Sequence, residues 1–196
     1  MAIKMTSDPF TIRGQLKHTV DLTSGQSGSD FSVLEIDQQL DTLSREILVI
    51  HEVDFDVYGN EFLEGVMSRQ NGSIAPNSLF ANLSLNIALS GENDIQSTVL
   101  SDPAFIAGRQ YTTVAGFATN WDNTPDTASY GSTGSKHPLA IVADGRMYLF
   151  CSHAFNGNDP ATAQSVGLTS AVRIMCQRAK ADSDTYAALL TGAYNG

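Results

Sequence analysis

Hydrophobic and polar residues alternate along most of this chain, which is the pattern of half-buried β-strands. The clearest case is the segment 81–90, ANLSLNIALS, in which Leu83, Leu85, Ile87 and Leu89 face one side and polar residues face the other. Comparable β-prone runs lie at 10–22 with a break at Gly14, and at 31–36, 45–59, 110–117, 139–150 and 168–177. Segments rich in Gly, Pro, Asn and Ser separate these runs. The pattern therefore predicts an all-β fold of about eight strands with long loops.

Two local signals add detail to this prediction. Asp144-Gly145 joins two apolar runs, which predicts a β-hairpin closed by a two-residue type I′ turn with positive φ at both central residues. Near the end of the chain, Asp182 or Ser183 is suited to cap a short helix that runs through Leu190. Strands and helices do not alternate, and no internal repeat of solenoid or propeller length is present. An antiparallel sandwich or jelly roll with a short C-terminal helix is the architecture that fits.

The segment 45–59, REILVIHEVDFDVYG, contains a possible ligand cluster. We call its three carboxylates the acidic stripe: Glu52, Asp54 and Asp56. Residues two apart on a strand share a face and lie ~7 Å apart, and the same alternation places His51 on the other face with Val53 and Phe55. Hard cations need several converging oxygens, which loops supply more readily than one straight strand. We therefore interpret the stripe as solvated or facing another subunit, with a weak cation site as the alternative, and we assign no metal.

Length and charge restrict the classes of function. The chain has 196 residues, enough for one sizeable core, so we predict a single domain over 1–196 with residues 1–9 as a flexible arm. The formal net charge is -10, and the 11 basic residues form no cluster in the sequence. Proteins that neutralise phosphates need a basic patch or arm. Nucleic-acid binding is therefore expected to be weak or indirect.

No apolar segment approaches the ~18 residues that a membrane-spanning helix requires. The N-terminus MAIKMTSDPFTI lacks the apolar region of a secretory signal, so the chain is expected to be made and kept inside a cell. The two cysteines, Cys151 and Cys176, fit no metal-ligand spacing and sit in apolar stretches. Buried free thiols are the favoured interpretation, and a disulfide between neighbouring strands remains the alternative.

No motif in the chain indicates catalysis. The nucleophile elbow G-x-S-x-G and the zinc motif H-E-x-x-H are missing, and the glycine spacing of 131–137, GSTGSKH, does not match a phosphate-binding loop. Cys151 and His153 share a strand face, but a catalytic dyad needs a semi-exposed thiol, whereas Cys151 is expected to be buried. We therefore predict no enzyme and no cofactor. Trp121 and Tyr130 lie among polar loop residues and fit either sugar stacking, as in a lectin, or a core gap beneath the loop.

The order of these features resembles the single jelly-roll capsid proteins of small icosahedral viruses. The resemblance rests on REILVIHEVDFDV, the alternating ANLSLNIALS, the Trp-bearing loop, LAIVADGRMYLFCSH and the late VRIMCQR run. It implies two four-stranded sheets in a wedge, with loops at its ends and subunit contacts on its lateral faces. The chain lacks the basic N-terminal arm of many such proteins, which disfavours direct genome packaging.

The expected function is accordingly that of a structural protein that self-assembles into an icosahedral virion. Its partners would be further copies of itself, in capsomers, and other capsid proteins. It would be made in the host cytoplasm and reside in the virion. The alternative function is a carbohydrate- or ligand-binding β-sandwich that uses Trp121 and Tyr130. A cupin-like metalloenzyme is disfavoured because the paired His-x-His motif is missing.

Overall fold

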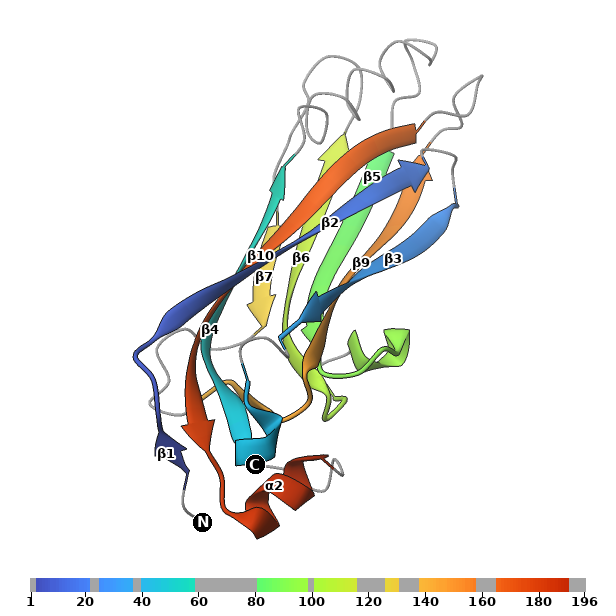
Figure 1. Ribbon diagram of the computed structural model, residues 1–196. Coiled ribbons are helices and arrows are strands. Elements are labelled where there is room, and N and C mark those ends of the chain that lie inside the picture. The colour runs from blue at the N-terminus through green and yellow to red at the C-terminus, as the bar shows by residue number, and fades with distance from the viewer. Residues whose placement is uncertain are drawn as a thin grey trace.

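The computed structural model describes residues 3–21, 25–36, 40–58, 81–98, 101–115, 126–130, 138–157 and 165–190. Its strands form two antiparallel sheets, and one hydrophobic core between them draws buried residues from both (Figure 1). No helix in these ranges is long and apolar enough to cross a membrane.

The first sheet has the strand order β2-β10-β4-β8. These strands are β2 (Phe10–Asp21), β10 (Ser165–Lys180), β4 (Glu46–Tyr58) and β8 (Ala140–Val142). The long β10 pairs with β2 over its first part, and its last residues pair with β1 (Lys4–Met5). Residues 4–5 thus lie beside β10. The flexibility of the arm 1–9 stays a prediction.

The second sheet has the order β3-β9-β5-β6-β7. These strands are β3 (Ser27–Glu35), β9 (Arg146–Gly157), β5 (Ala81–Ser90), β6 (Phe105–Ala115) and β7 (Asp126–Tyr130). Two short 3-10 helices, η2 (Thr42–Ser44) and η3 (Ile95–Thr98), lie in the connections. The helix α2 (Ser183–Leu190) follows β10 and lies with β1 at the lower end of the sandwich (Figure 1).

The pairing of the strands is that of a jelly roll. Leaving aside the edge strands β1 and β7, the first strand pairs with the last (β2 with β10), the second with the second-last (β3 with β9), and so on through β4 with β8 and β5 with β6. A chain folded back on itself as one long hairpin and then rolled up gives this nested pairing. The prediction of an eight-stranded antiparallel jelly-roll sandwich with a short C-terminal helix is confirmed.

The predicted hairpin at Asp144-Gly145 is wrong. The strands on its two sides, β8 and β9, belong to different sheets, since β8 pairs with β4 whereas β9 pairs with β3 and β5. Asp144 does not have positive φ, so the turn is not of type I′. Instead it carries the chain from one sheet to the other, and the backbone N–H of Ile36 donates to the carbonyl of Gly145 at 2.8 Å.

Several strand boundaries also differ from prediction, two of them in β2 and β3. The structure has one continuous β2 through Gly14, where a break was expected. A glycine fits this position because a Cβ atom here would overlap the side chain of the core residue Leu34. The strand expected at 31–36 begins earlier, since β3 starts at Ser27 and pairs with β9 from there.

The apolar run at the start of β4 is buried on both faces. Leu48 and Ile50 belong to the core between the sheets, whereas Ile47 and Val49 form a second cluster with Ala179. Side chains of α2 pack against this second cluster. The helix begins where predicted, because the backbone N–H of Thr185 donates to the carboxylate of Asp182 at 2.8 Å, which is an N-cap bond.

Candidate functional site

The acidic stripe lies on the outer face of the first sheet. Along this half of β4, Phe55 is buried, and Val53 and Val57 pack against the core, as the alternation predicted. The register places Glu52 opposite Met175 and Asp54 opposite Arg173. Met175 is 39% exposed, so this face of the sheet is open in the single chain.

A β-bulge interrupts β4 at His51. Cys176 pairs with Ile50 and Met175 pairs with Glu52, so His51 is one extra residue that has no partner across β10. A bulge changes the alternation of side chains by one position. For this reason the inward positions are 48 and 50 before His51 but 53, 55 and 57 after it. The bulge interrupts the alternation at His51, so the face of its side chain does not follow from that of Val53, and its placement beside Val53 and Phe55 stays a prediction.

The middle carboxylate of the stripe already has a cationic partner. Arg173 donates from Nε and Nη2 to one oxygen of Asp54, at 2.9 and 2.5 Å, and both side chains are substantially exposed. The neighbouring Asp54 carboxylate raises the pKa of Arg173 further above its usual value, by hydrogen bonding and then by charge. The ion pair leaves less negative charge at the stripe for a metal ion. Within the described ranges, no three His, Cys, Asp or Glu side chains are grouped so as to hold a metal.

The residues predicted for sugar stacking are placed only in part. Trp121 lies outside the described residues. Tyr130 ends β7 at the edge of the second sheet, with its backbone paired opposite Gly108 of β6. A role for these two aromatic residues stays a prediction.

The outer face of the second sheet carries an aromatic patch that the sequence reasoning did not single out. We define this patch by four residues on β3 and β9: Phe31, Val33, Tyr148 and Phe150. The ring of Phe31 lies 5.8 Å from that of Phe150 and 6.4 Å from that of Tyr148, centroid to centroid. Phe31 is 49% exposed and Val33 is 39% exposed. Large apolar side chains gathered on an open sheet face mark a surface suited to contact with a partner.

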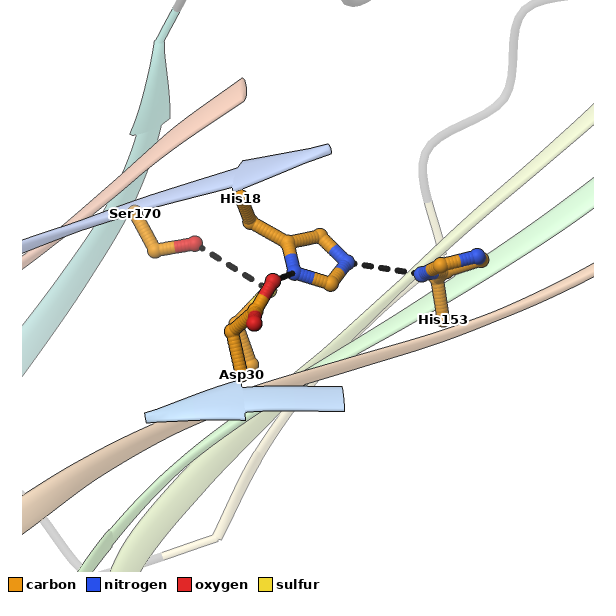
Figure 2. A network of polar contacts seen from close by, with 5 residues as sticks. His18, Asp30, His153 and Ser170 are labelled. Atoms are coloured by element: carbon orange, nitrogen blue, oxygen red, sulfur yellow. Dashed lines mark hydrogen bonds and ion pairs between the residues drawn. The ribbon is translucent and has the colours of Figure 1, made fainter. Parts of the chain in front are cut away.

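A second unpredicted feature is a polar network buried between the sheets (Figure 2). His18 reaches inward from β2, whereas Asp30 and His153 come from β3 and β9 of the other sheet. Nδ1 of His18 lies 2.6 Å from a carboxylate oxygen of Asp30, and its Nε2 lies 2.7 Å from Nδ1 of His153. We call these three side chains the histidine network. Both imidazoles are buried, at 3% and 6% exposure, while the side chain of Asp30 is 53% exposed.

The hydrogen bonds of the network determine which nitrogen atoms of the two imidazoles carry protons. An ionised carboxylate only accepts, so Nδ1 of His18 donates to Asp30. One proton then lies between the two facing nitrogens, because a hydrogen bond needs one donor and one acceptor. Nε2 of His153 is buried and has no hydrogen-bond partner among the described residues. Burial, followed by the charge of His18, lowers the pKa of His153.

Cys151 lies on the same inward face, two residues from His153. Its thiol is fully buried, and the hydroxyl of Ser170 lies 3.4 Å from its sulfur. Burial raises the pKa of this thiol to about 11. Cys176 is also buried, and both cysteines are free, which confirms the favoured interpretation of buried free thiols. A thiol with so high a pKa is not a nucleophile at neutral pH.

The histidine network was missed because its members are distant in sequence. His18 and His153 are 135 residues apart, and only the nested pairing of the strands brings their sheets together at this point. The available signal was position within the alternation. His18 stands between Leu16 and Val20 on the inward face of β2, where a polar side chain requires a partner.

Comparisons with known proteins find similarity in fold. No family model matches the chain, and no curated protein matches it. Among solved structures, VP1 of Trichodysplasia spinulosa-associated polyomavirus, in complex with GM1 oligosaccharide, is similar with a TM-score of 0.45 and 10% identity, over 90% of this chain and 96% of that one. The unassembled VP1 pentamer of Merkel cell polyomavirus has a TM-score of 0.44 and 11% identity, over 91% and 98%. Merkel cell polyomavirus VP1 in complex with 3'-sialyllactosamine has a TM-score of 0.42 and 10% identity, over 93% and 99%.

Proposed function

We propose that this chain is a shell-forming capsid subunit that self-assembles into an icosahedral virion. The observation that carries the proposal is the aromatic patch on the outer face of the second sheet, with Phe31 at 49% exposure. If the protein were a monomer, this patch would expose large apolar side chains to water with no partner surface to cover them. In a shell, the same face is covered by a neighbouring subunit.

The jelly roll supports the proposal because it presents two broad sheet faces to neighbours. The first sheet also exposes an apolar side chain, Met175 at 39%, beside the Arg173–Asp54 ion pair. Mixed apolar and polar contacts of this kind are typical of interfaces that are repeated by symmetry. In such an assembly the partners are further copies of this chain and other shell proteins, and the protein resides in the virion.

Assembly is measured on the purified full chain by sedimentation velocity and negative-stain microscopy over a range of concentration, salt and pH. We expect rings, capsomers or closed particles. The double variant Phe31→Ser/Val33→Ser should raise the concentration needed for assembly at least ~tenfold, because removing a buried interface aromatic residue commonly costs more than ~1 kcal/mol. Since both side chains are already partly exposed in the single chain, its thermal stability should fall much less than on truncation of a core residue.

Ile95→Ser is the matched control. Ile95 is 41% exposed, comparable to Phe31, but lies on η3 outside the aromatic patch. The control variant should assemble like the original chain. A monodisperse monomer at high concentration under every condition of salt and pH would overturn the proposed function. Equal assembly of the double variant and the control would show that the aromatic patch takes no part in assembly.

The acidic stripe belongs to the same proposal as a subunit boundary. If Glu52, Asp54 and Asp56 share a cation in the assembled shell, that cation bridges subunits, and a chelator added to the same assembly experiment weakens assembly. Unchanged assembly in chelator leaves the stripe as a metal-free contact.

Sugar binding by Trp121 and Tyr130 is the rival function, and it predicts signals on a glycan array. Silence on the array, together with a melting temperature unchanged by Ca²⁺, rejects this function.

A further inference from the structure

We propose that the histidine network is an acid-sensitive latch that holds the two sheets together at one end of the sandwich. Both of its hydrogen bonds cross between sheets, because His18 belongs to the first sheet and its two partners belong to the second. The latch concerns the single chain and does not depend on the proposed function. Its failure and the failure of assembly are therefore separate outcomes.

The network tolerates one imidazolium but not two. With both imidazoles neutral, Nδ1–H of His153 donates to Nε2 of His18, and Nδ1–H of His18 donates to Asp30. With one proton added to the pair, His18 carries both N–H groups and donates to Asp30 and to Nδ1 of His153, whose own proton then lies on Nε2, and both bonds persist. A second proton gives two N–H groups facing each other at 2.7 Å with no acceptor between them. Two cations then lie with ring centroids 4.8 Å apart, and they repel each other.

The groups around the pair do not relieve this repulsion fully. The charged groups that act on His153 are His18 itself, Asp21 of β2 and Asp30 of β3, and both carboxylates favour the protonated form. On β9 the thiol of Cys151 is neutral, and β10 contributes the uncharged Ser170. The neighbouring strand β5 places Leu85 opposite His153. Desolvation outweighs the carboxylates, and the pKa of His153 is lowered in consequence.

The packing leaves little room for the rings to adjust. A Cβ atom built on Gly28 of β3 would lie 2.7 Å from Cε1 of His153, so the backbone of β3 already touches the ring. Nearby, Gly25 donates to the carbonyl of Phe155, and Phe155 donates to the carbonyl of Gln26. Gly25 and Gln26, which precede β3, are thus bonded to β9 two residues beyond His153. Separation of the imidazoles is expected to loosen β3 and these two residues first.

The test compares the full chain with His153→Gln across pH 5 to 8 by denaturant unfolding. Because the folded pKa of His153 lies below its ordinary value, the unfolded chain binds more protons as the pH falls below about 6.5. Stability is therefore full above that pH, is lost as the pH falls, and levels off below the folded pKa. Relative to His153→Gln, the unfolding equilibrium constant of the original chain should rise by up to about tenfold per pH unit in this window.

His51→Gln is the matched control, since His51 is a half-buried histidine outside the network. It should keep the steep pH dependence. Hydrogen exchange supplies a second readout that needs no folded variant: amides of β3 should lose protection at pH 5 relative to pH 7, after correction for intrinsic rates, while those of β10 keep it. Parallel pH curves for the original chain and His153→Gln would overturn the latch. Equal protection of β3 at both pH values would overturn it as well.

Discussion

At the scale of single residues, burial determines what the chemically distinctive side chains of this protein do. Cys151 and His153 share the inward face of β9, yet the structure gives each a different partner, Ser170 for the thiol and His18 for the imidazole. Both shifts have desolvation as their first cause, and each favours the neutral form: the pKa of the thiol rises and that of the imidazole falls. The result is a polar network without a nucleophile.

The thiols provide a prediction at this scale. Both cysteines have pKa values raised to about 11, so at pH 8 roughly one thiol in a thousand is ionised. We expect a disulfide reagent such as Ellman's to label the folded chain at least about a hundredfold more slowly than the chain in urea. The measurement is the absorbance of the released thiolate with time. Rapid labelling of one thiol per folded chain would contradict the burial of that cysteine.

The same shift has a consequence at alkaline pH. A thiol whose folded pKa is raised keeps its full contribution to stability below the ordinary value of 9.0 and loses it as the pH rises toward 11. Replacing Cys151 with Ser should therefore flatten the loss of stability between these pH values, as measured by urea unfolding. Cys176→Ser should flatten the loss in the same way, because burial also raises the pKa of the Cys176 thiol to about 11. Unchanged pH curves for both variants would contradict the raised pKa values.

At the scale of elements, the two-residue alternation predicted which strands exist but not how they pair. The run 81–90 and the tail helix 183–190 agree with prediction because each depends on local sequence alone. The segment 139–150 was misread because two apolar runs joined by Asp-Gly satisfy a hairpin and a crossover between sheets equally well. Only the partner strands, β4 on one side and β3 on the other, distinguish them.

The candidate sites differ in the same way: features set by local sequence were predicted, and features set by strand pairing were not. The acidic stripe was correctly assigned to one face of β4 from residue 52 onward, because three alternating carboxylates need only local geometry. The bulge at His51 was not predicted, since it depends on the register against β10. The aromatic patch and the histidine network both join strands far apart in the sequence, so no local pattern contained them.

Glycine substitutions test the packing of the elements. In β2, a Cβ atom on Gly14 would lie 2.3 Å from Cδ2 of the buried Leu34, so Gly14→Ala should cost about 1–3 kcal/mol of unfolding free energy through overpacking. In β10, a Cβ atom on Gly167 would meet nothing within 4 Å. Gly167→Ala should be neutral or stabilise by up to about 1 kcal/mol, because alanine loses less backbone entropy in a strand. Urea unfolding of both variants measures the difference, and equal stabilities would contradict the close packing at Gly14.

At the scale of the whole molecule, charge and exposed apolar surface act in opposite directions. Each chain carries a formal net charge of -10, so copies repel one another in dilute buffer. The aromatic patch favours contact, and its contribution is insensitive to moderate salt because it is apolar. The balance between the two is therefore expected to depend on ionic strength.

This balance makes the salt dependence of assembly informative. Raising the ionic strength from about 0.1 M to 1 M shortens the Debye length from about 10 Å to about 3 Å, which screens repulsion between subunits while leaving the patch intact. We expect the sedimentation profile of the full chain to shift toward larger species across this range, and we expect Phe31→Ser/Val33→Ser to shift much less. Dissociation on adding salt would instead indicate that complementary charges, such as a carboxylate of the acidic stripe with a basic residue of a neighbour, hold the subunits together. That result would move the main contact from the second sheet to the first, because the stripe and Arg173 lie on the outer face of β4 and β10.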